Sequence, residues 1–138
     1  MISDSTFMNI AVEVSASSYA VKKKVGCIIV KNHNIIAIGY NGTPSGFDNN
    51  CETLCLITNK LKTNKEVLHA ESNAIAKCAT GTSSSEGAKM YCTYSPCFNC
   101  AKLIVQAKIK AVYFKEYYKI KDGLALLKNA GIEIKYLP

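Results

Sequence analysis

The stretch AKMYCTYSPCFNCAKLIVQAKIKAVYFKE, residues 88–116, decides the fold class of this chain. Its first part is apolar and aromatic and predicts a strand over residues 88–94. Pro96 then opens a helix over residues 96–107, and KAVYFKE predicts a second strand over residues 110–116. A strand, a helix and a strand in direct succession indicate two parallel strands joined by a helical crossover.

The segments on either side extend this unit into a larger sheet. Downstream, a helix that Gly131 closes is followed by a last strand over residues 132–137. Upstream, the pattern predicts a helix within residues 3–23, a hairpin of strands 25–31 and 35–40, and a helix over 69–79. We therefore expect one α/β domain, residues 1–138, built as a three-layer α/β/α sandwich with a five-stranded mixed sheet.

Two segments do not fit this regular pattern. Residues 39–50, GYNGTPSGFDNN, carry three glycines, a proline and several asparagines, which are typical of a loop. Residues 50–67 are polar and rich in lysine, and we expect a mobile or inserted region there.

Composition narrows the class of protein. No secretory signal or membrane-spanning run is present, and an odd count of seven cysteines fits poorly with a full set of disulfides, so the expected location is the cytoplasm, with no membrane partner. The net charge of +7 raises the question of nucleic-acid binding. Every basic residue is lysine, however, whereas bidentate readers of guanine and phosphate are usually arginines. Nucleic acid is therefore an unlikely partner, and a phosphorylated small molecule explains the charge as well.

Three residues of metal-binding type open two predicted helices. His69 begins one helix, and Cys97 and Cys100 share a face in the first turn of another. Catalytic zinc sites keep three protein ligands and one open position for water. Glu71 lies two residues after His69, on another side of the helix, and is suited to move protons as a carboxylate beside the metal.

Other interpretations of these residues remain open at this point. The two cysteines of the C-x-x-C pair have the spacing of a redox pair. A further cysteine, Cys51, Cys55 or Cys78, would close the zinc site as a structural centre, and Cys51 and Cys55 are also candidates for a second metal site. His33, in the hairpin turn, is expected to be solvated.

The combined motifs identify a family by resemblance. His69-Ala70-Glu71 and Pro96-Cys97-Phe98-Asn99-Cys100 resemble the signature of the zinc-dependent nucleobase deaminases. VGCIIV, GYNGTPSG and HAESNAI make the chain most similar to deoxycytidylate (dCMP) deaminases, over nearly its whole length. The glycine-rich loop separates these enzymes from tRNA adenosine deaminases, which lack it.

This resemblance implies hydrolysis of dCMP to dUMP and ammonia by a zinc-activated water, with Glu71 as the proton shuttle. It implies that the Ala70 N–H binds the base, that the Ser95 carbonyl faces the leaving amine and that Asn41 binds the sugar. We expect Lys24 and Tyr118 to bind the phosphate.

Regulation and assembly are further implications of the resemblance. Such enzymes are commonly hexamers that dCTP activates and dTTP inhibits, with Mg²⁺, through the loop that here contains Gly39, Tyr40, Asn41, Gly42 and Gly46. The wealth of lysine without arginine hints at an AT-rich, virus-encoded source. Two alternatives are another base deaminase on the same scaffold, acting on cytidine, guanine or tRNA adenosine, and a basic zinc module that edits or binds nucleic acid.

Overall fold

Four helices and seven strands make up the chain in the computed structural model, which describes residues 1–138. The longest helix has 12 residues, and none of the four has both the length and the apolar run that a bilayer-spanning helix requires. In chain order the elements are α1 (Asp4–Ser15), β1 (Gly26–Lys31), β2 (Asn34–Tyr40), β3 (Glu52–Cys55), β4 (Lys60–Thr63), α2 (Ala70–Thr80), β5 (Lys89–Tyr94), α3 (Phe98–Gln106), β6 (Ala111–Glu116), α4 (Asp122–Asn129) and β7 (Glu133–Tyr136).

The main sheet has five strands in the order β2-β1-β5-β6-β7. Strand β1 runs antiparallel to both β2 and β5, whereas β5, β6 and β7 are parallel to one another. The two parallel pairs are the ones joined by helical crossovers, as the stretch from β5 to β6 predicts. The expected mixed five-stranded sheet is confirmed.

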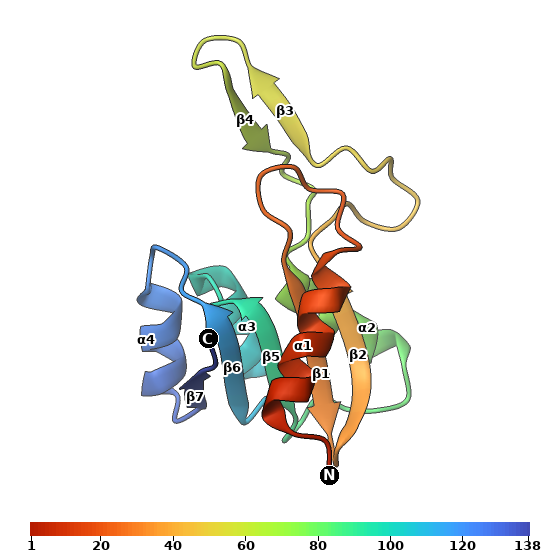
Figure 1. Ribbon diagram of the computed structural model, residues 1–138, viewed down its shortest axis with the longest axis vertical. Helices are drawn as coiled ribbons and strands as arrows, with labels where there is room; N and C mark the ends of the chain where they lie inside the picture. The colour runs from red at the N-terminus through yellow and green to blue at the C-terminus, as the bar shows by residue number, and fades with distance from the viewer.

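Helices cover both faces of this sheet (Figure 1). Side chains alternate along β1, so Ile28 and Val30 pack with Phe7 of α1, while Cys27 and Ile29 face the opposite layer. That opposite layer holds α2, α3 and α4, and it contains the larger of two buried apolar clusters. The arrangement is the three-layer α/β/α sandwich expected from the sequence.

The first helix is shorter than the sequence suggests. It ends at Ser15, and the following residues form a loop in which Ser18 Oγ donates a hydrogen bond to the Asn41 carbonyl over 2.7 Å. The same oxygen accepts the Ala20 N–H over 3.1 Å. The serine hydroxyl thus binds backbone groups that would otherwise need partners within a helix. Such side-chain hydrogen bonds compete with helical pairing and favour a loop here.

The polar segment expected to be an insertion forms a hairpin of its own. Strands β3 and β4 pair antiparallel, from Glu52 opposite Thr63 to Cys55 opposite Lys60. In Figure 1 this hairpin projects away from the main sheet at the top of the molecule. Leu56 and Ile57 at its tip are 89% and 96% exposed, which shows that the insertion has no apolar core of its own.

Gly39 lets helix α2 lie directly on strand β2. A Cβ atom at this position would lie 2.6 Å from the Ala74 nitrogen and closer still to the Ala70 carbonyl oxygen. Both contacts are with backbone atoms that cannot move without shifting the helix. Since α2 begins beside His69, this close approach also fixes the position of a candidate site residue.

Gly39→Ala is therefore expected to reduce the free energy of unfolding by at least about 2 kcal/mol, as overpacking of a rigid contact does. Chemical denaturation monitored by circular dichroism measures the change. Gly81→Ala is the control, because its nearest contact would be an ordinary 3.5 Å from the Lys77 carbonyl oxygen. Equal stability of the two variants would contradict the close packing of α2 on β2.

Candidate active site

Two helix N-termini and the carboxyl ends of two parallel strands meet at one edge of the main sheet. His69 is the N-cap of α2 and Cys97 is the N-cap of α3. Ser95 follows the end of β5, and its N–H donates to the Glu116 carbonyl at the end of β6 over 2.9 Å. In sheets with parallel strands, ligands commonly bind outside the carboxyl ends of the strands.

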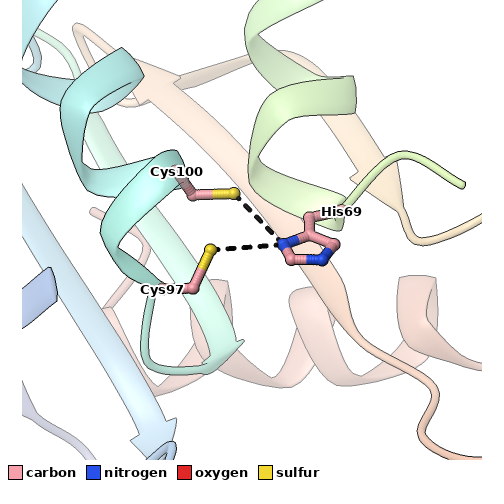
Figure 2. A group of neighbouring side chains, drawn as sticks. All are labelled: His69, Cys97 and Cys100. Carbon is pink, nitrogen blue, oxygen red and sulfur yellow. Dashed lines mark hydrogen bonds between the residues drawn. The ribbon is translucent and has the colours of Figure 1, made fainter. Parts of the chain in front are cut away.

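The predicted metal-ligand trio comes together at this edge. The Sγ atoms of Cys97 and Cys100 each lie 3.4 Å from Nδ1 of His69, and the three side chains converge from α3 and the start of α2 (Figure 2). All three candidate ligand atoms lie within 4.8 Å of one another. His69 meets the cysteines off the end of its helix, as its position at the N-cap allows.

The spacing of the trio fits a zinc ion. Bond lengths of about 2.3 Å to sulfur and about 2.1 Å to nitrogen, at a tetrahedral angle, place the two ligand atoms roughly 3.6 Å apart. The observed 3.4 Å agrees with this geometry. Two thiolates and an imidazole are also the ligand types that zinc prefers, so this donor set suits the metal.

Protons are shared unequally within the trio. Hydrogen bonds from Cys100 and His69 lower the pKa of Cys97, and the same contact together with burial raises the pKa of Cys100. The hydrogen bond to Cys97 raises the pKa of His69. Binding of a cation releases the protons that these side chains hold, because metal ligands must be deprotonated.

Glu71 is a buried carboxyl beside the trio. Its side chain is 4% exposed, and burial raises its pKa to about 7, while the neighbouring His69 lowers it. A carboxyl with a pKa near neutrality both accepts and donates protons efficiently at physiological pH. Its placement in the first turn of α2 also gives it access to the same cavity as His69.

A cavity of about 400 Å³ opens over the trio, a volume within the range of small-molecule sites. Its lysines are Lys22, Lys23 and Lys119. Lys24, the lysine expected to face the phosphate, does not line this cavity and lies instead beside a separate depression. Lys22 and Lys23 therefore bring their charges to the cavity, whereas Lys24 brings its charge to the separate depression.

The other predicted substrate residues do line the cavity. Asn41, Ala70, Ser95 and Tyr118 all belong to its wall. The Ser95 hydroxyl accepts the Tyr118 N–H over 2.6 Å, which holds the segment after β6 over the site. Ala70 is the first residue of α2, where backbone N–H groups have no acceptor within the helix.

The glycine-rich loop separates two recesses. Asn41 lines the main cavity, whereas Tyr40 lines a second recess of about 670 Å³ together with Lys24. Gly42 pairs through its backbone with Leu68, just before the trio's histidine. The remaining predicted effector residues have backbone roles, since Gly39 packs on α2 and Gly46 adopts a positive φ of 88°.

Several cavity residues carry no signal in the sequence. Glu52 and Thr63 reach the site from the base of the β3–β4 hairpin, and Lys119 reaches it from the segment after β6. Tyr94 is the exception, because the last residue of a parallel strand is expected at the ligand-binding edge.

No further cysteine joins the trio. The metal-type cluster consists of His69 and the two cysteines of α3 alone, and Cys51, Cys55 and Cys78 lie outside it. Cys51 lines the same cavity, but it belongs to no second cluster of metal-ligating side chains. The trio therefore leaves a coordination position open to the cavity, which is the arrangement of a catalytic zinc site.

A three-ligand zinc site beside a buried carboxyl, at the edge of an α/β sheet, defines a zinc-dependent hydrolase. Comparison with known proteins agrees: residues 1–116 match the model for the cytidine and deoxycytidylate deaminase zinc-binding region. The chain belongs to this family of zinc-dependent deaminases.

Individual relatives extend over nearly the whole chain. The deoxycytidylate deaminase of Enterobacteria phage T4 is 38% identical, over 97% of this chain and 89% of the relative. That of Saccharomyces cerevisiae is 35% identical, over 96% of this chain and 44% of the relative. The dCMP deaminase from cyanophage S-TIM5, in its crystal structure in complex with dCMP and dUMP, is 41% identical in sequence. The match covers 99% of this chain and 100% of that chain, with a TM-score of 0.89. The resemblance to deoxycytidylate deaminases is confirmed.

Proposed function

We propose that the protein deaminates dCMP to dUMP and ammonia. The observation that carries this proposal is a buried Glu71 next to the His69–Cys97–Cys100 trio, at the bottom of a cavity that also contains lysines. The substrate class is supported by the T4 relative, a deoxycytidylate deaminase, and by the S-TIM5 enzyme, which was crystallised with dCMP and dUMP. The reaction supplies dUMP for thymidylate synthesis.

Glu71 is the proton shuttle of this proposal. Zinc held by His69, Cys97 and Cys100 supplies a Lewis acid that activates a water for attack on the cytosine ring. Glu71 would take one proton from that water and deliver it to N3 as the hydroxide adds to C4. It would then take the second proton from the hydroxyl on C4 and pass it to the amine, so that the C4–N bond breaks, ammonia leaves and the C4 carbonyl forms. Burial raises the pKa of Glu71, which helps it to hold a proton between the two transfers.

Backbone groups hold the base in place. The Ala70 N–H, at the start of α2, donates to O2 of cytosine, and the Ser95 carbonyl accepts from the amine that leaves. A cytosine in this orientation presents C4 to the metal site. Asn41 and Tyr118 line the walls where the sugar and phosphate extend.

Lysines at the cavity replace the arginines that the chain lacks. Lys23 Nζ lies 2.7 Å from a Glu116 oxygen and 4.8 Å from the centre of the Tyr94 ring. Both members of this ion pair are about half exposed, and such pairs stabilise a protein by less than about 1 kcal/mol. A phosphate therefore competes readily for Lys23, and Lys22 and Lys119 add further positive charge.

Lys23→Ala is expected to raise KM for dCMP roughly tenfold or more, the effect of losing one charge-assisted contact, with little change on deoxycytidine. Steady-state assays of ammonia release on both substrates measure this. Lys24→Ala is the matched comparison, because it removes the same charge outside the cavity. If Lys24→Ala weakens dCMP use more than Lys23→Ala does, the lysine assignment from the structure is wrong.

A substrate panel tests the activity itself. The zinc-loaded protein should release ammonia from dCMP much faster than from deoxycytidine, dCTP or guanine. The ultraviolet change of cytosine on deamination gives an independent readout. Turnover of deoxycytidine or guanine at least as fast as that of dCMP would favour another base deaminase on the same scaffold.

We further propose regulation at the glycine-rich loop. Tyr40 and Lys24 line the second recess while Asn41 lines the main cavity, so one loop contacts both. A triphosphate bound at this recess, dCTP as activator or dTTP with Mg²⁺ as inhibitor, acts on the substrate site through that loop. A shift of the dCMP saturation curve by dCTP and its reversal by dTTP tests the proposal, and an unchanged curve with both nucleotides would contradict it.

We also propose that the single deaminase domain forms a homo-oligomer, a hexamer as in similar enzymes. Phe47, Leu56 and Ile57 expose large apolar side chains around the projecting hairpin, and subunit contacts would bury such surfaces. Sedimentation velocity distinguishes a hexamer from a monomer. The phage relatives support a virus-encoded enzyme, and we propose that it acts in the host cytoplasm.

A further inference from the structure

The segment that brings lysines to the cavity is held at both ends by side chains from distant parts of the chain. We call residues 21–25 the lysine segment. We propose that Glu52 is a positioning residue that fixes the lysine segment over the cavity and so makes the site prefer a nucleoside monophosphate to a nucleoside. This proposal rests on the proposed function, because it concerns the phosphate of the same substrate.

Glu52 binds the first half of the lysine segment through backbone groups. Its Oε2 accepts the N–H of Val21 over 2.9 Å and the N–H of Lys22 over 3.1 Å. The Glu52 side chain is buried, at 8% exposed, and it lines the cavity. A carboxylate that accepts two N–H groups makes charge-assisted hydrogen bonds, about twice as strong as neutral ones.

Asn41 binds the second half of the lysine segment. Its Oδ1 accepts the Val25 N–H over 2.8 Å, and its Nδ2 donates to the Lys23 carbonyl over 2.7 Å. The Asn41 N–H also donates to the Val25 carbonyl over 3.3 Å. The backbone on both sides of Lys23 is thus fixed, and only its side chain remains free to leave its exposed ion pair.

This arrangement explains a carboxylate in a cavity that receives an anion. A negative charge beside a phosphate would repel it unless the carboxylate did something else. Glu52 is directed at the N–H groups of Val21 and Lys22, and three lysines stand beside it in the cavity wall. Without Glu52, residues 21 and 22 would have no anchor to the hairpin, and the lysines would sample many positions before binding phosphate, at an entropic cost.

The position of Glu52 in the chain gives the hairpin a role. Glu52 is the first residue of β3, opposite Thr63, and both lie where the projecting hairpin joins the body of the protein (Figure 1). The base of the insertion is therefore part of the substrate site, although its tip is far from it along the strands. The hairpin contributes to selection of the phosphate end of the substrate, not to the chemistry at the base.

Equilibrium binding of two product ligands tests the proposal. Calorimetric titration of the zinc-loaded protein with dUMP and with deoxyuridine separates the phosphate contribution from the nucleoside contribution. In Glu52→Ala, the affinity for dUMP should fall by a factor about tenfold larger than the affinity for deoxyuridine does. This difference corresponds to one good charge-assisted contact. Glu52→Gln keeps an acceptor oxygen and should show a smaller preferential loss, of about threefold, in the same direction.

Glu66→Gln is the matched control. It removes one negative charge near the same hairpin, but Glu66 is exposed and lies outside the cavity. Its affinities for both ligands should equal those of the parent protein. A preferential loss of dUMP affinity in Glu66→Gln as large as that in Glu52→Gln would overturn the proposal, because the loss would then not depend on the contacts that Glu52 makes with residues 21 and 22.

Equal weakening of dUMP and deoxyuridine in the Glu52 variants would overturn the proposal, since Glu52 would then contact the nucleoside or support the whole site. Unchanged dUMP affinity would overturn it as well. If Glu52→Ala does not fold, Glu52→Gln decides between these results alone. Failure of the proposed function has a different signature, because the parent protein itself would then bind deoxyuridine as well as dUMP or fail to deaminate dCMP.

Discussion

Glu71→Gln should lower kcat for dCMP by at least about a thousandfold and leave zinc bound. Glutamine has nearly the same shape, but its amide cannot carry a proton from water to the base and on to the amine, and general acid–base catalysis contributes about 10² to 10⁴ in rate. Glu71 has two proton transfers to make, so the expected loss lies in the upper part of that range. Ammonia release measures the rate, and atomic absorption measures zinc in the same sample.

The control for this variant is Glu66→Gln, which makes the same substitution on an exposed side chain outside the cavity. It should retain full activity. Residual turnover above about a tenth of the parent rate in zinc-loaded Glu71→Gln would remove Glu71 from the proton path. Loss of zinc together with activity would show that Glu71 supports the metal site instead.

Cys100→Ser should abolish both zinc retention and dCMP turnover. The Cys100 Sγ lies 3.4 Å from His69 Nδ1, at the spacing of two ligands on one zinc ion, and a serine hydroxyl is a poor zinc ligand at neutral pH. With only His69 and Cys97 left, zinc affinity should fall at least about a hundredfold. Loss of a residue that merely hydrogen-bonds a metal ligand already costs up to about a hundredfold, and loss of a ligand itself should cost no less. Dialysis against a weak chelator followed by metal analysis measures the retained zinc.

Cys78→Ser provides the matched control. Cys78 lies on α2, the helix that begins beside His69, but it does not belong to the metal-type cluster. This variant should keep one zinc per chain and parent-like activity. Zinc loss in Cys78→Ser would indicate that a third cysteine closes the site as its fourth ligand, which is the structural-zinc arrangement and not a catalytic one.

The parts of the fold that follow local rules are predictable from the sequence. Strands β5 and β6 and helix α3 show clear periodicity, and Pro96 marks the start of the helical region. Asn32 and His33 both adopt positive φ in the β1–β2 turn, which is the geometry of the short hairpin that the Asn-rich sequence predicts. His33 is exposed there, as expected.

The metal site is predictable because its ligands sit at helix starts. His69 and Cys97 are N-caps, so their side chains point beyond the helix ends towards a common edge of the sheet. The end of α1 is less predictable, since the apolar spacing continues past Ser15 while the backbone does not. The hydrogen bond from Ser18 to the Asn41 carbonyl, 23 residues along the chain, favours the loop, and no local pattern encodes it.

The phosphate side of the site depends on long-range placement. A run of three lysines offers no local reason to choose among its members, and only the tertiary fold brings Lys22 and Lys23 to the main cavity and Lys24 to the separate depression. The role of Glu52 is equally hidden in the sequence, because a carboxylate in a polar insertion is ordinarily a solvated surface group. Its contact with residues 21 and 22 comes from the tertiary fold alone.

Zinc titration of the metal-free protein, with dCMP turnover as the readout, tests most directly whether the trio and Glu71 form a catalytic metal site. The chain holds one metal-type cluster, so activity should rise in proportion to added zinc and reach its plateau at one equivalent per chain. The same titration of Cys100→Ser should give no activity at one equivalent. Full dCMP turnover without metal, or one bound zinc with no dCMP turnover, would contradict the account.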